Sequence, residues 1–271
     1  MSARAWRTPL VRFARRAAVE ISEPARIGHL LRIEPQMSRR LLAEYLGSLL
    51  LGAIVVGSGI MAQQLSPGDV GLELLENAAA TAAGLYVLIT LFAPLSGAHF
   101  NPAVSFVDAA LGGISWRRAI SYLPAQLLGC STGSVIANLM FSRHAVSLST
   151  HHRASWAHLG SEVVATAGLL LVIFGLSRSK RGSSVAAAVA CYIGAAYFFT
   201  SSTSFANPAI AVGRTLSNSF AGIAPSSVAG FVGAEMVGAI LGFGLLKVLF
   251  PTGASIEYSH HPQRENDEVE R

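Results

Sequence analysis

The tripeptide Asn-Pro-Ala occurs twice in this chain, each time at the end of an apolar segment. The two copies are Asn101, Pro102, Ala103 and Asn207, Pro208, Ala209. Asparagine is a good helix N-cap and proline is favoured at the first helical position, so each copy predicts the start of a helix. The helical stretches that follow, about 101–110 and 207–217, are too short to cross a bilayer. Broken segments at matching positions in two halves of a chain are typical of a membrane transport site.

The composition indicates a lipid environment. Charged residues make up 13% of the 271 positions, whereas soluble domains carry roughly 25%. A helix needs about 20 apolar residues to cross a bilayer. Six runs have this length, at about 40–62, 72–93, 116–141, 158–177, 183–202 and 224–249. The predicted fold class is an all-α membrane protein with six transmembrane helices and two re-entrant half-helices.

The two halves of the chain, about 40–141 and 158–249, have the same order of segments. Each predicts two long helices, a broken segment and a third long helix. Because each half has an odd number of spans, the second enters the membrane upside down relative to the first. The result is an inverted repeat, in which the two broken segments meet near the midplane from opposite faces.

Basic residues are unevenly distributed over the predicted loops. Of the 20 lysines and arginines, only Arg143, Arg153 and Arg214 fall on one side of the membrane. The positive-inside rule then puts both termini in the cytoplasm. We expect a multi-pass protein of the cell inner (plasma) membrane.

Three regions are expected along the sequence. Residues 39–250 form the membrane domain. Residues 1–38 form a basic extension, interpreted either as an amphipathic helix on anionic lipid or as a disordered segment, with Met37 as an alternative start. Residues 251–271 are polar and are expected to be a disordered tail.

The start of a helix is electrostatically positive. Its first N–H groups lack partners within the helix, and the aligned peptide dipoles leave about half a positive charge there. Two such ends facing each other repel cations and interrupt a proton-conducting chain of water. The side-chain amides of Asn101 and Asn207 can donate to water or to a neutral hydroxylated solute. The doubled motif therefore predicts a pathway for small uncharged solutes.

A glutamate lies early in the first helix of each half, where an ionisable group is costly and usually functional or structural. We expect Glu44 and Glu162 to be buried acceptors for backbone N–H groups of the broken loops; proton coupling is the alternative. Gln126 is expected to be a similar buried hydrogen-bonding residue. His99 is expected to anchor the first motif loop.

Both motifs, the two glutamates and the six-plus-two helix pattern resemble the aquaporin (major intrinsic protein) family, over roughly residues 39–250. The resemblance implies an aquaporin-like channel domain in a homotetramer, with one pore per subunit. It implies passage of water or small uncharged solutes through the lipid bilayer. It also implies no cofactor, metal site, nucleic acid partner or enzymatic activity.

The chain departs from the family pattern at the position after the second motif, where Ile210 replaces an arginine of the family's narrow filter. Counting back from the motifs suggests which residues take the other filter places. These candidates are Thr81 or Ala83 on the second helix, Ala195 or Gly194 on the fifth, and Ser204 or Thr203 in the second loop. Every candidate is small, so a wide constriction without the usual charge is expected.

A displaced charge is a further hypothesis. Arg214 follows Ile210 by four residues, so both lie on one helix face. The helical rise puts Arg214 roughly 6 Å further toward the outside. Arg214 then replaces the filter arginine at a wider point, or it pairs with loop carbonyls or lipid headgroups instead.

Residues 205–209, 213–216 and 220–223, together with 38–41 and 56–62, resemble a bacterial branch of the family encoded in arsenic-resistance operons. That branch implies trivalent arsenic acid or methylated arsenicals as solutes. A channel selective for water or glycerol, with no arsenic role, is the alternative. The rivals outside the channel class are a gradient-coupled secondary transporter and a membrane protein that has lost conduction.

Overall fold

The computed structural model describes residues 37–251. The chain divides into two structural units after Ser38, and the second unit contains all of the described helices apart from the first two residues of α3. The expectations for the N-terminal extension and the C-terminal tail concern residues 1–36 and 252–271, which lie outside this range.

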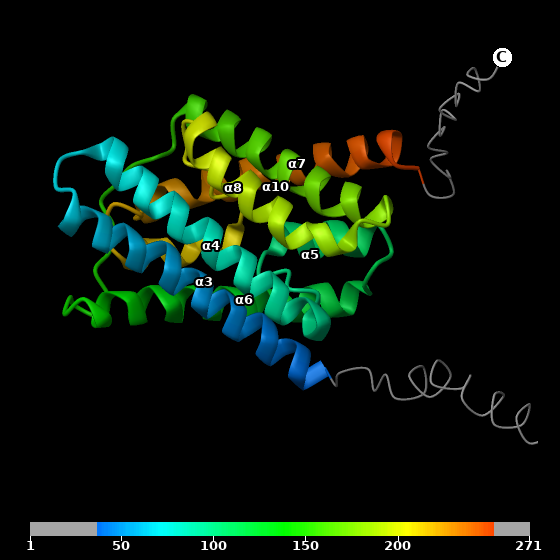
Figure 1. The fold of residues 1–271 in the computed structure, drawn as a ribbon, viewed down its shortest axis with the longest axis horizontal. Coiled ribbons are helices and arrows are strands. Elements are labelled where there is room, and N and C mark those ends of the chain that lie inside the picture. Colours follow the sequence, from blue (N-terminus) through cyan, green and yellow to red (C-terminus); the bar gives the residue numbers. More distant parts are fainter. Residues whose placement is uncertain (1–36, 252–271) are drawn as a thin grey trace, which may run out of the picture. The chain divides into compact units, whose positions relative to one another are not determined.

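The described part is helical throughout (Figure 1). In chain order the elements are α3 (Met37–Leu65), α4 (Val70–Ser96), α5 (Pro102–Ala110), α6 (Trp116–Met140), α7 (Trp156–Arg178), the 3-10 turn η1 (Gly182–Ser184), α8 (Val185–Phe199), α9 (Pro208–Gly213), the 3-10 turn η2 (Arg214–Leu216) and α10 (Pro225–Leu249). Each half has two long helices, one short helix and one long helix. The predicted all-α architecture of six long and two short helices is confirmed.

Five of the long helices within residues 37–251 are long and apolar enough to cross a membrane. The sixth long helix, α6, has 25 residues but carries Arg117 and Arg118 in its first turn and Pro124 and Gln126 further along. These polar residues lower its hydropathy. It packs against the short helices α5 and α9, which begin at the two motifs, as well as against α3.

The two short helices begin where the motifs predict. Asn101 and Asn207 are the N-caps, both in extended backbone conformation, and a proline is the first helical residue in each case. The second short helix is shorter than expected, because regular α-helix ends at Gly213 and continues only as the 3-10 turn η2.

Small residues allow matching pairs of helices to approach closely in the two halves. A Cβ atom on Gly133 of α6 would lie 2.0 Å from the Leu49 carbonyl oxygen of α3. A Cβ atom on Gly238 of α10 would lie 2.6 Å from the Val163 carbonyl oxygen of α7. Only glycine fits where two helix backbones touch in this way.

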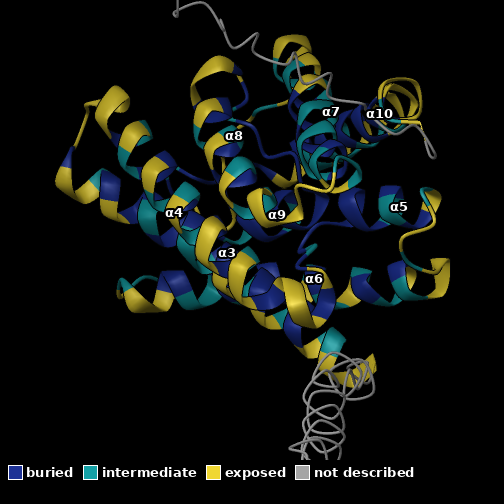
Figure 2. Ribbon diagram, turned by 45° about the vertical axis from the view of Figure 1, so that its right-hand side comes forward, coloured by how far each residue is buried: buried dark blue, intermediate teal, exposed yellow. Residues whose placement is uncertain are grey.

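Large apolar side chains are exposed on the outward faces of the long helices (Figure 2). Leu42, Val87, Leu128, Ile240 and Val248 are among them. Buried residues lie instead on the inward faces and along α5 and α9. An apolar exterior of this extent fits contact with lipid or with another apolar protein surface.

Candidate functional site

The two motif loops are joined by a reciprocal pair of hydrogen bonds. The Asn101 side-chain amide donates to the Ala206 carbonyl at 2.7 Å, and the Asn207 amide donates to the Phe100 carbonyl at 2.9 Å. The side-chain oxygens of the same asparagines accept from backbone N–H groups of their own helices. Each asparagine therefore caps one helix and holds the loop that leads into the other.

The loops have unusual backbone conformations at matching places. Ala98 and Phe100 have φ values of 52° and 50°, and Ser204 and Ala206 have 49° and 48°. These are the third and the first residues before each motif asparagine. A left-handed conformation in a non-glycine residue is uncommon and costs about 1–3 kcal/mol, so surrounding contacts must hold it.

Glu44 supplies those contacts in the first half. It is fully buried, and its carboxylate accepts hydrogen bonds from the backbone N–H groups of His99 and Phe100 at 3.0 and 2.7 Å. It also accepts from the Ser96 hydroxyl and from the Gln126 side-chain amide. With four donors around one carboxylate, a charged acceptor is well suited to this position.

Glu162 has the equivalent place in the second half. It accepts from the backbone N–H groups of Phe205 and Ala206 at 2.9 and 2.7 Å. A third buried acid, Glu235 of α10, accepts from the backbone N–H of Asn207 at 3.0 Å. Glu235 was not predicted from the sequence, although a glutamate inside an apolar run was an available signal.

His99 is tied to the first short helix by both ring nitrogens. Nδ1 lies 3.0 Å from the Ser105 hydroxyl, and Nε2 lies 3.2 Å from the Asp108 carboxylate. The Ser105 hydroxyl also accepts from the Gln126 amide. The histidine side chain therefore links the first loop to α5 and, through Ser105, to α6.

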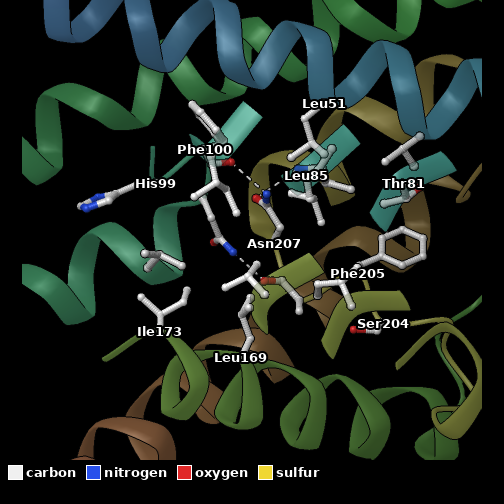
Figure 3. A pocket seen from close by; sticks show the side chains of 18 of the residues that line it. Leu51, Thr81, Leu85, His99, Phe100, Leu169, Ile173, Ser204, Phe205 and Asn207 are labelled. Atoms are coloured by element: carbon white, nitrogen blue, oxygen red, sulfur yellow. Dashed lines mark hydrogen bonds between the residues drawn. The ribbon is translucent and has the colours of Figure 1, made fainter. Parts of the chain in front are cut away.

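A cavity of about 70 Å³ lies where the two loops meet, and a buried water needs roughly 10–15 Å³. Most of its wall is apolar, from Leu51, Leu85, Leu169 and Ile173 among others. The polar lining residues are Thr81, His99, Asn101, Tyr197, Ser204, Asn207 and Arg214. Figure 3 shows Asn207 near the centre of the cavity, with His99 toward one end and Thr81, Ser204 and Phe205 toward the other.

Four of the residues expected at the filter line this cavity, namely Thr81, Ser204, Ile210 and Arg214. The expectation for the fifth span was wrong. Ala195 is exposed on the far face of α8, and a Cβ atom on Gly194 would contact Ala82 of α4. The lining residues of α8 are Val189, Ile193 and Tyr197, spaced by four along the helix.

Tyr197 brings a large aromatic side chain into the lining of the cavity. The Tyr197 hydroxyl lies 3.1 Å from the Thr81 hydroxyl, and the aromatic ring of Phe205 is also in the wall. The lining of the cavity therefore includes a tyrosine, a phenylalanine and an arginine, where small and uncharged side chains were expected.

The side chain of Arg214 pairs with a loop carbonyl and also lines the cavity. It is buried, and its Nε donates to the Ala221 carbonyl of the loop that leads to α10. Its guanidinium carbon lies 3.5 Å from the centroid of the Phe205 ring, a cation–π geometry. The same residue lines the cavity.

Each half of the chain contributes one short helix, and the two helices begin at the same buried cavity. This arrangement is typical of a membrane transport protein. Residues 32–205 match the Major intrinsic protein family. Aquaglyceroporin AqpS of Rhizobium meliloti is 44% identical over 230 residues, which is 85% of this chain and 98% of the relative. The chain therefore belongs to the major intrinsic protein family.

Two further similarities agree with this assignment. A glycerol uptake facilitator protein of Streptococcus pneumoniae is 27% identical over 234 residues, covering 79% of this chain and 99% of the relative. The X-ray structure of the aquaglyceroporin from Plasmodium falciparum matches with a TM-score of 0.60 at 22% identity. It covers 80% of this chain and 98% of its own, and it is similar in fold.

Proposed function

We propose that this protein is a passive channel for small uncharged solutes, with glycerol and trivalent arsenic acid among them. The observation that carries the proposal is the cavity at the two crossed asparagines. Leu51, Leu85 and Leu169 give the wall an apolar character, while the amides of Asn101 and Asn207 provide donors. A polyol with carbon on one side and hydroxyls on the other fits such a lining.

Charge exclusion follows from the two helix starts. The backbone N–H groups of α5 and α9 leave partial positive charge at the cavity, so a cation is repelled there. Irregular backbone is tolerated at membrane depth where it is buried or lines a wet cavity. Passage without an ion gradient is therefore the expected mode of transport.

The proposed filter uses Arg214 in place of the arginine that the family has at position 210. Arg214 lies one helical turn beyond Ile210, held by the Ala221 carbonyl and the Phe205 ring. Nε is committed to the loop, whereas the remaining guanidinium donors are available to a solute oxygen. Thr81 and Tyr197 face the same part of the cavity.

Arsenic transport is supported by the resemblance of residues 205–209, 213–216 and 220–223 to channels of arsenic-resistance operons. Trivalent arsenic acid is a neutral molecule with three hydroxyls, similar in shape to glycerol. A water- or glycerol-selective channel is the second candidate. The hydroxyl contact between Thr81 and Tyr197 supports selectivity for water in particular, because two side chains joined at the cavity leave less room for a larger solute.

Gradient-coupled transport is less well supported. A coupling acid must meet the solute or the ion, but Glu44 and Glu162 hydrogen bond to loop N–H groups. Neither is among the residues that line the cavity. We further propose a homotetramer in the inner membrane with both termini cytoplasmic, supported by the exposed apolar faces and by the basic residues.

Stopped-flow uptake into proteoliposomes tests the proposed function. Water, glycerol and arsenite are compared at equal gradients, with no ion or proton gradient imposed. Uptake of all three above that of empty liposomes is expected. Glycerol uptake without arsenite uptake would leave the second candidate, and uptake that needs an ion gradient would exclude a passive channel.

Arg214→Ala tests the displaced filter arginine. We expect a changed ratio of glycerol to water permeability, because the substitution removes a charged donor and opens space beside Phe205. Arg143→Ala is the matched control, since Arg143 is a loop arginine outside the cavity. An unchanged permeability ratio in Arg214→Ala would exclude this filter role.

A further inference from the structure

Arg153, in the segment that links the two halves, makes an extensive set of contacts with the loop before α10. Its Nε donates to the Gly222 carbonyl at 2.8 Å, and its Nη2 donates to the Phe220 carbonyl at 3.0 Å. Its backbone N–H donates to the Ser227 hydroxyl at 3.0 Å. The rigid planar fork of arginine suits two carbonyls at a fixed separation.

The carbonyl between those two belongs to Ala221, and it is the acceptor used by Nε of Arg214. Two guanidinium groups therefore hold three consecutive carbonyls of one loop. Both also lie near the Phe205 ring, with guanidinium carbons 5.6 Å and 3.5 Å from its centroid for Arg153 and Arg214 respectively. Phe205 is the ring that precedes the second motif by two positions.

The segment around Arg153 is itself tied down on both sides. Ser147 and Ser149 donate backbone hydrogen bonds to the carbonyls of Leu216 and Thr215, next to Arg214. The N–H of Ala224 donates to the His151 carbonyl at 2.8 Å. Backbone hydrogen bonds of residues 147–151 therefore hold the segment that carries Arg153 next to residues 220–222.

We propose that Arg153 is a positioning residue that sets the place of the Arg214 guanidinium group in the solute filter. Arg153 holds the carbonyls of Phe220 and Gly222. Because the Ala221 carbonyl lies between them in the chain, its position as the acceptor for Arg214 is held as well. This inference rests on the proposed function, in which Arg214 meets the solute. It assigns solute selectivity to a residue that lies outside the cavity lining.

The electrostatics of the pair explain why position matters. Two cations beside one another repel, and the Ala221 carbonyl oxygen and the face of the Phe205 ring help to hold Arg214 in place against that repulsion. When Arg153 is removed, residues 220–222 lose two charged donors and the Ala221 carbonyl is free to move. Arg214 then samples other positions in the cavity, and the discrimination between solutes changes.

The first test measures the ratio of glycerol to water permeability in proteoliposomes for Arg153→Gln, Arg214→Gln and the double variant. Arg143→Gln is the control, because Arg143 belongs to the same linking segment and its side chain makes a long hydrogen bond, 3.4 Å, to the Asn218 carbonyl. The ratio does not depend on how much channel folds. Arg153→Gln should shift it about threefold or more, in the direction of Arg214→Gln, and the double variant should go no further.

A ratio in Arg153→Gln equal to that of Arg143→Gln, or an additive double variant, overturns the proposal. Arg153→Lys keeps the charge but not the fork, so it should resemble Arg153→Gln. A wild-type ratio in Arg153→Lys would assign the effect to charge and overturn positioning by the fork.

A second measurement does not depend on transport. Hydrogen–deuterium exchange of purified protein should be about tenfold faster across residues 217–224 in Arg153→Gln than in Arg143→Gln, since hydrogen bonds to a charged donor are lost. Unchanged exchange overturns the proposal. If the wild-type protein passes neither glycerol nor water, the proposed function fails, and exchange alone decides whether Arg153 holds the loop.

Discussion

The hydroxyl oxygens of Thr81 and Tyr197 lie 3.1 Å apart, joining α4 to α8 at the cavity. Both side chains are almost completely buried and both line the cavity. A phenol ring held in this way takes up space that a solute would otherwise use. The size of the solutes that pass should therefore depend on Tyr197.

Tyr197→Ala should admit larger polyols than the wild-type protein does. The substitution removes the ring from the cavity, and the loss of such a buried aromatic also lowers stability by about 3–5 kcal/mol. Tyr197→Phe keeps the ring and should change the size limit little. Uptake of glycerol, erythritol and ribitol measures the limit, with Tyr192→Phe as a control on the same helix, outside the cavity.

Asn207→Leu should weaken both the fold and the exclusion of cations. The variant loses the cap of α9, which contributes about 0.5–2 kcal/mol, and the hydrogen bond to Phe100. Thermal unfolding in detergent and cation leakage from liposomes measure the two effects. Asn218→Ala, at an exposed position, should leave both unchanged, and equal behaviour of the two variants would contradict the role given to the cap.

Glu44→Gln should be far more damaging than Glu235→Gln. Glu44 accepts from four donors, and the amide of a glutamine would turn N–H groups toward some of them, leaving buried donors unpaired at about 1–3 kcal/mol each. Glu235 accepts one hydrogen bond, from the Asn207 N–H, and its other oxygen has no partner among the described residues, so a glutamine can keep the single acceptor.

Unfolding midpoints and glycerol uptake of the two glutamine variants compare these positions directly. Equal losses in the two variants would refute the distinction drawn between the acids.

Gly133→Ala should destabilise the packing of α6 on α3. The added Cβ atom would meet the Leu49 carbonyl at 2.0 Å, and overpacking of this kind costs about 1–3 kcal/mol. Gly233→Ala is the matched control, since a Cβ atom on that glycine of α10 would meet nothing within 4 Å beyond its chain neighbours and its own helix backbone. The unfolding midpoint should fall for the first variant and stay or rise for the second.

Local signals made much of the fold predictable. Asparagine followed by proline acts within one turn, so the starts of α5 and α9 could be read directly from the motifs. Long apolar runs gave the spanning helices, with bounds shifted by a few residues. The extent of α9 was not predictable in this way, because the 3-10 turn begins at Arg214, whose side chain bonds to the Ala221 carbonyl of a later part of the chain.

The rotation of α8 about its axis, which decides the residues that face the cavity, could not be predicted from the sequence either. Counting back from Asn207 to Ala195 assumes a connection of known length, but residues 200–206 separate α8 from Asn207, whereas only residues 97–100 separate α4 from Asn101. A shift of two positions turns a helix by more than half a turn, so Tyr197 rather than Ala195 faces the cavity. Glu235, by contrast, was visible and was overlooked.

The crossed asparagine bonds also have a consequence for how the protein is made. Asn101 donates to a carbonyl 105 positions later, and Asn207 donates to one 107 positions earlier. While the ribosome is still synthesising the second half, the first loop has its cap and its glutamate but lacks its partner across the bundle. The conducting path is therefore completed only after insertion of the second half, so a nascent chain cannot leak solutes through a finished pore.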